Sequence, residues 1–135
     1  RSAVFALPEV KRGLVAAGGG LMRLPQRIPF QWAMEFALTG DNLTATRAAE
    51  IGLVNRLVDD GRARDEAVAL AKTIAANGPL AVRATRQIMT HGLDWPAGEF
   101  FGRQSAYSEP VRSSADAREG ALAFAEKRPP QWRGE

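Results

Sequence analysis

The sequence predicts an α/β chain that is mainly helical, with one strand at its start. Residues 3–7 form a short apolar run of small, aromatic and β-branched residues that ends at Pro8, which is typical of a buried strand. Apolar residues then recur at helical spacing in several segments, separated by capping and helix-breaking residues. Of the 135 residues, 45% are hydrophobic and 24% are charged, as in an ordinary globular protein.

The first half of the chain carries the signals of short helices. Pro29 suits the first turn of a helix that ends at Thr39-Gly40, and Thr44 is a plausible cap for a helix that ends at Gly52. A lone strand is unstable, and the chain supplies no evident partner for residues 3–7. The elements expected are a turn with a short helix over 8–16, a short helix over 18–23 stopped by Pro25, helices over 29–38 and 44–51, and a strand or extended segment over 53–58.

The second half predicts a succession of longer helices. Residues 63–76 have the clearest amphipathic pattern, and Asn77-Gly78-Pro79 ends that helix and starts another that runs to about His91. The remaining expectations are a break over 92–98, a helix over 97–108 stopped near Pro110, a last helix capped by Ser114 and running to Lys127, and a non-helical tail over 128–135.

Composition excludes several kinds of site. The chain has no cysteine, so it has no disulfide, thiolate metal site or cysteine nucleophile. A single histidine, His91, leaves no multi-histidine cluster, and no metal site is predicted. No apolar stretch approaches the roughly 20 residues of a membrane span, and no signal-peptide pattern is present. We therefore expect a cytoplasmic protein with no membrane partner.

The balance of charge gives little support to a nucleic-acid partner. The formal net charge is +3, from 18 basic and 15 acidic residues that are spread along the chain. Dispersed basic residues usually lie on solvated helix faces. Residues 44–56 have the outline of a helix-turn-helix motif, but residues 53–58 are β-like and are followed by two aspartates, which suits a recognition helix poorly. DNA binding is the least favoured interpretation.

One carboxylate and a glycine triplet are the strongest candidates for a site. Glu9 follows the apolar run directly, and a carboxylate held beside an apolar wall can exchange protons near neutral pH. Gly18, Gly19 and Gly20 would let the backbone approach a ligand closely. The alternatives are a helix-terminal acid stabilised by the helix dipole and a tightly packed turn.

Four blocks of sequence stand out in order along the chain. They are Phe5–Glu9 with Gly13, Ala33–Glu35 with Leu38–Gly40, Ala48–Asn55, and Glu119–Gly120 with Ala123–Arg128. In this order the blocks resemble the crotonase (enoyl-CoA hydratase/isomerase) superfamily. The form FALPE and the tail pattern EKR-x-P-x-W are more similar to its carnitinyl-CoA dehydratase members, and Ala17 departs from a glycine that many hydratases have there.

The resemblance implies a parent fold built as a spiral of ββα units, of which this chain is mainly the helical C-terminal half. Residues 1–27 would then be the end of the spiral core, with the active-site strand and the glycine-rich turn, and residues 28–135 the helical and oligomerisation region. It also implies a trimer or hexamer. The oxyanion-hole donors and a second catalytic glutamate would lie upstream of residue 1, so we expect the isolated chain to be inactive and to need the missing N-terminal half of the same protein.

The resemblance further implies an acyl-CoA thioester substrate, with coenzyme A as part of the substrate and no separate cofactor. Glu9 would be the catalytic general acid/base, and Gly18, Gly19, Phe124 and Lys127 would bind substrate. The expected reaction is the reversible addition of water to a 2-enoyl-CoA through a thioester enolate. Isomerisation, dehydration of carnitinyl-CoA and a non-catalytic oligomerisation role stay open as alternatives.

Overall fold

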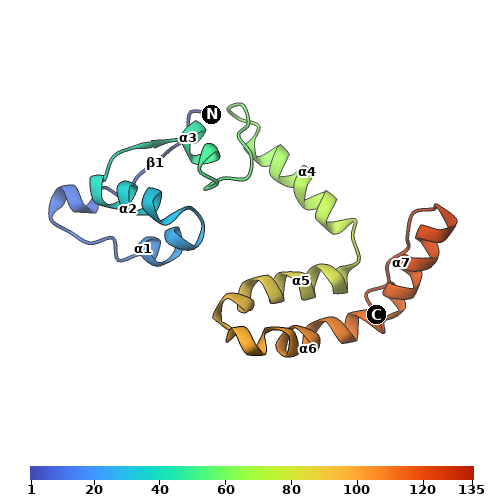
Figure 1. Cartoon of the computed structure of the whole chain (residues 1–135). Helices are drawn as coiled ribbons and strands as arrows, with labels where there is room; N and C mark the ends of the chain where they lie inside the picture. The colour runs from blue at the N-terminus through green and yellow to red at the C-terminus, as the bar shows by residue number, and fades with distance from the viewer. The chain divides into compact units, whose positions relative to one another are not determined.

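The computed structural model describes residues 1–135, which divide into two compact units, Arg1–Glu66 and Ala67–Glu135. The first unit holds the short elements, coloured blue to green in Figure 1, and the second holds longer helices. The elements of the first unit are β1 (Val4–Phe5), η1 (Pro8–Arg12), α1 (Gly20–Arg23), η2 (Leu24–Gln26), α2 (Phe30–Thr39), β2 (Leu43–Thr44) and α3 (Ala45–Glu50), η denoting a 3-10 helix.

The leading strand has a partner within the chain, which corrects the expectation that none is supplied. β1 pairs antiparallel with β2, with Val4 opposite Thr44 and Phe5 opposite Leu43. A two-residue strand is too short to show an alternating pattern, and β2 runs directly into the helix capped by Thr44. Residues 53–58 form no strand and no helix, so the outline of a helix-turn-helix motif is not realised.

A small apolar cluster holds the first unit together. Its buried members are Leu24, Ile28 and Ala33, and partly buried side chains pack around them from the strand end, α2 and the segment after α3. Helix α2 ends at Gly40 in the left-handed conformation, as predicted. The expected stop at Pro25 is only partial, because α1 ends at Arg23 but the 3-10 helix η2 follows it directly. Pro25 occupies an early position of η2, where its missing N–H costs no hydrogen bond.

The second unit is built from helices joined by tight turns. α5 (Pro79–His91) and α6 (Phe100–Arg112) pack side by side (Figure 1), and Trp95 in the turn between them lies 5.8 Å from both the Phe100 and the Tyr107 rings. The other elements are α4 (Ala63–Ala75), which begins within the first unit, η3 (Gly92–Asp94), η4 (Ala97–Glu99) and α7 (Ala115–Glu126).

The ends of α6 and α7 show where helix signals work and where they fail. Ser114 caps α7 as predicted, since its Oγ accepts a hydrogen bond from the Ala117 N–H. Pro110 does not end α6, which continues to Arg112. A proline this close to the C-terminal end removes one hydrogen bond without disturbing a long run of following turns.

None of the helices is long and apolar enough to cross a membrane. The division expected after residue 27 stays a prediction, because the two compact units describe how this chain packs and not the boundary of a parent core.

Candidate active site

Glu9 lies in the first turn of η1, a 3-10 helix that the local sequence defines closely. Pro8 occupies its start, and Gly13 ends it with φ +69°. The Gly13 N–H donates to the Val10 carbonyl at 3.2 Å, and the Leu14 N–H donates to the Glu9 carbonyl at 3.0 Å. The backbone of Glu9 is therefore held by the turn that follows it.

The side chain of Glu9 is held differently from its backbone. The residue is half-buried, and its Oε2 atom is inaccessible to solvent yet has no hydrogen-bond partner. A buried acceptor without a partner costs about 1–3 kcal/mol, and such exceptions are few in native proteins. This carboxylate oxygen is free to receive a proton or to hydrogen-bond a ligand.

An apolar pocket of about 280 Å³ adjoins the segment that leads into Glu9. Its wall includes Phe5, Ala6 and Leu7, and the other lining residues come from α1, η2 and the residue that follows it, α2, and the segment after α3. The remaining lining residues are Gly20, Arg23, Leu24, Arg27, Phe36 and Leu53. The two arginines are its only charged lining groups, so the pocket combines apolar surface with positive charge.

The glycine triplet, residues 18–20, packs against the segment between β1 and Glu9. A Cβ placed on Gly20 would lie 3.4 Å from the Leu7 side chain. Gly19 precedes α1 with φ +84°, a conformation that favours glycine, and its carbonyl accepts the Arg23 N–H. Nothing lies within 4 Å of a Cβ on Gly18, so packing within this chain does not require a glycine there.

Phe124 and Lys127 belong to the second unit, at the C-terminal end of α7. The Phe124 side chain is 87% exposed. Helix α7 ends at Glu126, and Lys127 caps it with φ +54°, the only non-glycine residue in the chain with positive φ. The helix expected to run to Lys127 therefore ends one residue earlier, and the i, i+3 spacing of Phe124 and Lys127 does not place ring and ammonium on one face of a continuous helix. Its ammonium makes no ion pair within the chain.

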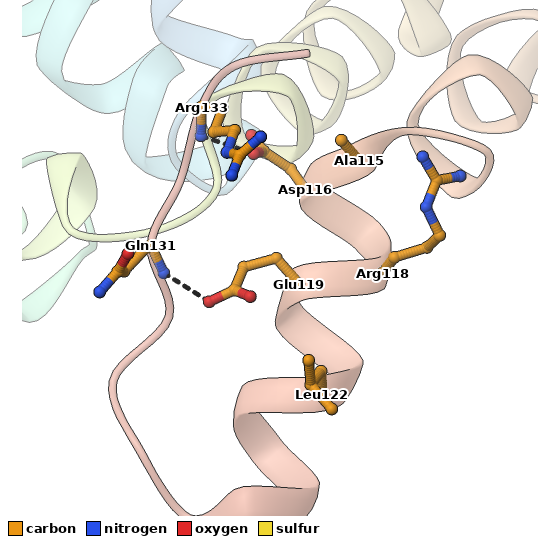
Figure 2. A pocket seen from close by; sticks show the side chains of 7 residues that line it. All are labelled: Ala115, Asp116, Arg118, Glu119, Leu122, Gln131 and Arg133. Carbon is orange, nitrogen blue, oxygen red and sulfur yellow. Dashed lines mark hydrogen bonds between the residues drawn. The ribbon is translucent and has the colours of Figure 1, made fainter.

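Two carboxylates of α7 anchor the tail, residues 128–135, and the sequence predicted this role for neither of them. Glu119 accepts hydrogen bonds from two nitrogens of the Arg128 guanidinium at 2.6 and 3.0 Å, and from the Gln131 N–H at 2.8 Å (Figure 2). These bonds, chiefly those from Arg128, lower the pKa of Glu119 from its ordinary 4.5 to about 2. Nine residues separate the charged partners across a helix end, so no periodic pattern pairs them.

Asp116 repeats this arrangement one turn earlier on α7. It is 4% exposed, and its two oxygens accept the Arg133 N–H at 2.7 Å and the Gly134 N–H at 3.0 Å. Its own backbone N–H donates to the Glu135 carbonyl at 3.1 Å. The pocket of about 250 Å³ between α7 and the tail is thus framed by carboxylates that already have partners (Figure 2).

Trp132 ties the tail to the turn between α4 and α5. Its indole N–H donates to the Ala76 carbonyl at 2.8 Å. Its ring lies against Gly78 and Gly120, where a Cβ would come within 3.6 and 3.2 Å of ring atoms. Trp132 is therefore a packing residue, and through it the tail fixes α7 to the start of α5. The chain holds no cluster of three or more side chains able to bind a metal ion.

A family model confirms the resemblance seen in the sequence. The model described as Enoyl-CoA hydratase/isomerase matches residues 1–135, the whole chain. Because this match covers the whole chain, the chain belongs to the enoyl-CoA hydratase/isomerase family.

Named relatives agree with this assignment. Enoyl-CoA hydratase EchA19 of Mycobacterium tuberculosis is 41% identical over 97% of this chain and 49% of its own length. Carnitinyl-CoA dehydratase of Proteus mirabilis is 42% identical over 98% of this chain and 52% of its own length. A crystal structure of an enoyl-CoA hydratase from M. tuberculosis H37Rv matches all of this chain and 54% of that protein, with a TM-score of 0.95 and 58% identity. The chain spans about half the length of these relatives.

Proposed function

We propose that this chain supplies the acid/base half of an acyl-CoA-processing enzyme that reversibly adds water to a 2-enoyl-CoA, with Glu9 as general acid/base. The observation that carries the proposal is the buried Oε2 atom of Glu9, which has no partner within the chain. The family match and the relatives named as hydratases support the substrate class.

In the proposed reaction, Glu9 removes a proton from water as the water oxygen bonds to the β-carbon of the enoyl thioester. The electron pair of the double bond moves onto the thioester as an enolate. Glu9 then delivers this proton to the α-carbon, which gives the 3-hydroxyacyl-CoA and regenerates the Glu9 carboxylate. The enolate charge needs hydrogen-bond donors aimed at the thioester oxygen. We place these donors and a second carboxylate in a segment that corresponds to the other half of the relatives. The "complete enzyme" below means this chain joined to or reconstituted with such a segment.

We propose that Lys127 and Phe124 contact the coenzyme A part of the substrate. A lysine stands at a helix end where glycine is preferred, in a backbone conformation that costs an ordinary residue about 1–2 kcal/mol. Strain of this kind is typical of functional positions.

Lys127→Ala in the complete enzyme should raise KM for the CoA ester by a factor that shrinks as salt rises, with kcat little changed. Phe124→Ala should raise KM without that salt dependence. An unchanged KM for Lys127→Ala at low salt would leave the lysine a solvated surface charge.

We further propose that residues 1–135 alone do not turn over crotonyl-CoA, and that the complete enzyme is a cytoplasmic trimer or hexamer. The chain corresponds to about half of each relative, and Glu9 needs its partner groups. Light scattering after gel filtration measures the oligomer. Turnover by residues 1–135 alone at the rate of an ordinary hydratase would refute the first statement. A chain that drives assembly but contributes no catalytic residue would instead be an oligomerisation module.

The reaction itself is tested by substrate comparison in the complete enzyme and its Glu9→Gln variant. General acid/base catalysis contributes roughly 10²–10⁴-fold, so Glu9→Gln should lower kcat on the best acyl-CoA by at least about 100-fold with the fold retained. A second candidate reaction, dehydration of carnitinyl-CoA, is favoured by the 42% identical relative of that name. Faster turnover of carnitinyl-CoA than of crotonyl-CoA would select it, and a shift of the double bond without net hydration would select an isomerase.

A further inference from the structure

The turn at Thr39–Asp41, called the Gly40 turn below, packs against the 3-10 helix that carries Glu9. A Cβ built on Gly40 would lie 3.0 Å from Val10 Cγ2, 3.2 Å from Lys11 Cγ and 3.3 Å from the Leu7 carbonyl oxygen. These contacts fall on both sides of Glu9 in the sequence. The turn therefore touches the backbone just before the glutamate and the side chains just after it.

Gly40 meets two separate requirements at this position. Its φ of +62° is one that L side chains rarely adopt, and its N–H closes α2 by donating to the Phe36 carbonyl at 3.3 Å. The contacts with η1 add a steric requirement to that of the positive φ. Gly52 is the contrast within the same unit, because its φ is +82° but nothing lies within 4 Å of a Cβ there.

A charged pair joins the same two segments beside Gly40. The Lys11 ammonium donates to Asp41 Oδ1 at 2.6 Å, and the Asp41 N–H donates to Thr39 Oγ1 at 3.3 Å. Both side chains of the ion pair are more than half exposed. Exposed ion pairs add little to global stability. This one joins the turn to the residue two positions after Glu9.

The helix that carries Glu9 has few contacts of its own to fix its position. η1 is a five-residue 3-10 helix, it has no side-chain hydrogen bond at its N-cap, and it contains no fully buried residue. Short 3-10 helices have poorer hydrogen-bond geometry than α-helices. External contacts must then define where the Glu9 side chain points, and the Gly40 turn provides them from both sides.

We propose that Gly40 and Asp41 are positioning residues that set the placement of the Glu9 carboxylate through η1. This inference rests on the proposed role of Glu9. Catalytic groups must be held to within about 0.5 Å, and a displacement of about 1 Å can cost 100-fold in rate. A methyl group at Gly40 would push Val10 and Lys11 by a few tenths of an ångström. This is a fraction of the displacement that costs 100-fold, so the carboxylate should be partly misplaced and the loss in rate should be smaller.

The main experiment compares Gly40→Ala with Gly52→Ala in the complete enzyme. Both variants place alanine at positive φ, but only the first contacts η1. Gly40→Ala should lower kcat by about three- to tenfold, with KM for the CoA ester changed less than about twofold. Gly52→Ala should keep kcat within about twofold. Adding Val10→Ala to Gly40→Ala removes the closest contact and should restore part of the lost kcat, which relief of general instability would not do.

A double-variant measurement separates this inference from the proposed function. If the turn acts through Glu9, Gly40→Ala should cause no further loss in a Glu9→Gln background, because the effects of coupled residues do not add. A full additional loss there, or normal kcat for Gly40→Ala alone, overturns the positioning role while leaving Glu9 catalytic. Near-normal turnover by Glu9→Gln overturns the proposed function itself.

If Gly40→Ala does not fold, Asp41→Asn provides the second test of the positioning role. The exposed pair can be broken with little loss of stability, and kcat should fall by about two- to fivefold, again only when Glu9 is present. Asp41→Asn with unchanged kcat, alongside an unfolded Gly40→Ala, would assign the turn a purely structural role and contradict the proposal.

Discussion

Glu9 in the first unit and Glu119 in the second are both half-buried glutamates, but they differ in the hydrogen bonds that their carboxylates accept. Glu119 has three hydrogen-bond donors, two of them from a guanidinium, and a pKa lowered to about 2. Glu9 leaves a buried oxygen without any partner. Asp116 follows the pattern of Glu119, with a backbone N–H on each oxygen.

This difference separates a structural carboxylate from a functional one. A satisfied carboxylate holds segments together, as Glu119 and Asp116 hold the tail to α7. An unsatisfied buried carboxylate costs free energy in the resting fold, and that cost is recovered only when a ligand or reacting proton arrives. Substitutions of Glu119, Asp116 and the tail that they hold should therefore act on stability, and substitutions around Glu9 on turnover.

The largest expected stability effect is that of Trp132→Ala. The ring packs on Gly78 and Gly120, and its N–H satisfies the Ala76 carbonyl. Its removal should lower the free energy of unfolding of the complete enzyme by about 3 kcal/mol, measured by urea titration. Arg133→Ala is the control, because Asp116 binds the backbone N–H of Arg133 and not its side chain. Equal loss in both variants would mean that the ring does not anchor the tail.

A smaller effect is expected from Glu119 as a function of pH. Its pKa is lower in the folded state than in the unfolded chain, so its contribution to stability is full above about pH 4.5 and is lost as the pH falls towards about 2. Urea unfolding of wild type and Glu119→Gln between pH 6 and 2.5 should show a stability difference that shrinks with acidification. A difference that stays constant over this range would contradict the assigned pairing with Arg128.

The smallest stability effect has the opposite sign. Lys127→Gly should raise the free energy of unfolding by about 1 kcal/mol, because glycine accepts the left-handed conformation without strain. The same variant should raise KM for the CoA ester. Lys127→Ala keeps the strained backbone and should share the rise in KM without the gain in stability. A gain in stability with unchanged KM would show that the lysine is not retained for binding.

Sequence patterns predicted the helices well because their caps are local. Thr44, Ser114 and Gly40 all mark helix ends where expected. The patterns failed where pairing is not local. The β1–β2 ladder joins residues about 40 positions apart through strands of two residues. The tail is held by carboxylates of α7 that accept hydrogen bonds from backbone N–H groups of the tail.

The candidate site shows the same limit. Glu9 could be chosen from its place after an apolar run, but its unpartnered oxygen depends on packing that no motif shows. The contact of Gly40 with η1 joins segments about 30 residues apart, and the helix-ending signal of Gly40 gives no hint of it. The left-handed backbone conformation of Lys127 could not be predicted, because lysine is common at helix C-termini and does not by itself indicate a positive φ.

The most direct test of the difference between the two carboxylates measures Glu9→Gln and Glu119→Gln side by side in the complete enzyme. Turnover of the best acyl-CoA and the free energy of unfolding at pH 7 are determined for both. We predict that Glu9→Gln lowers kcat by at least about 100-fold without lowering the free energy of unfolding, and that Glu119→Gln lowers stability and changes kcat far less. Near-normal kcat for Glu9→Gln, or a loss of stability in that variant equal to that of Glu119→Gln, would contradict the account.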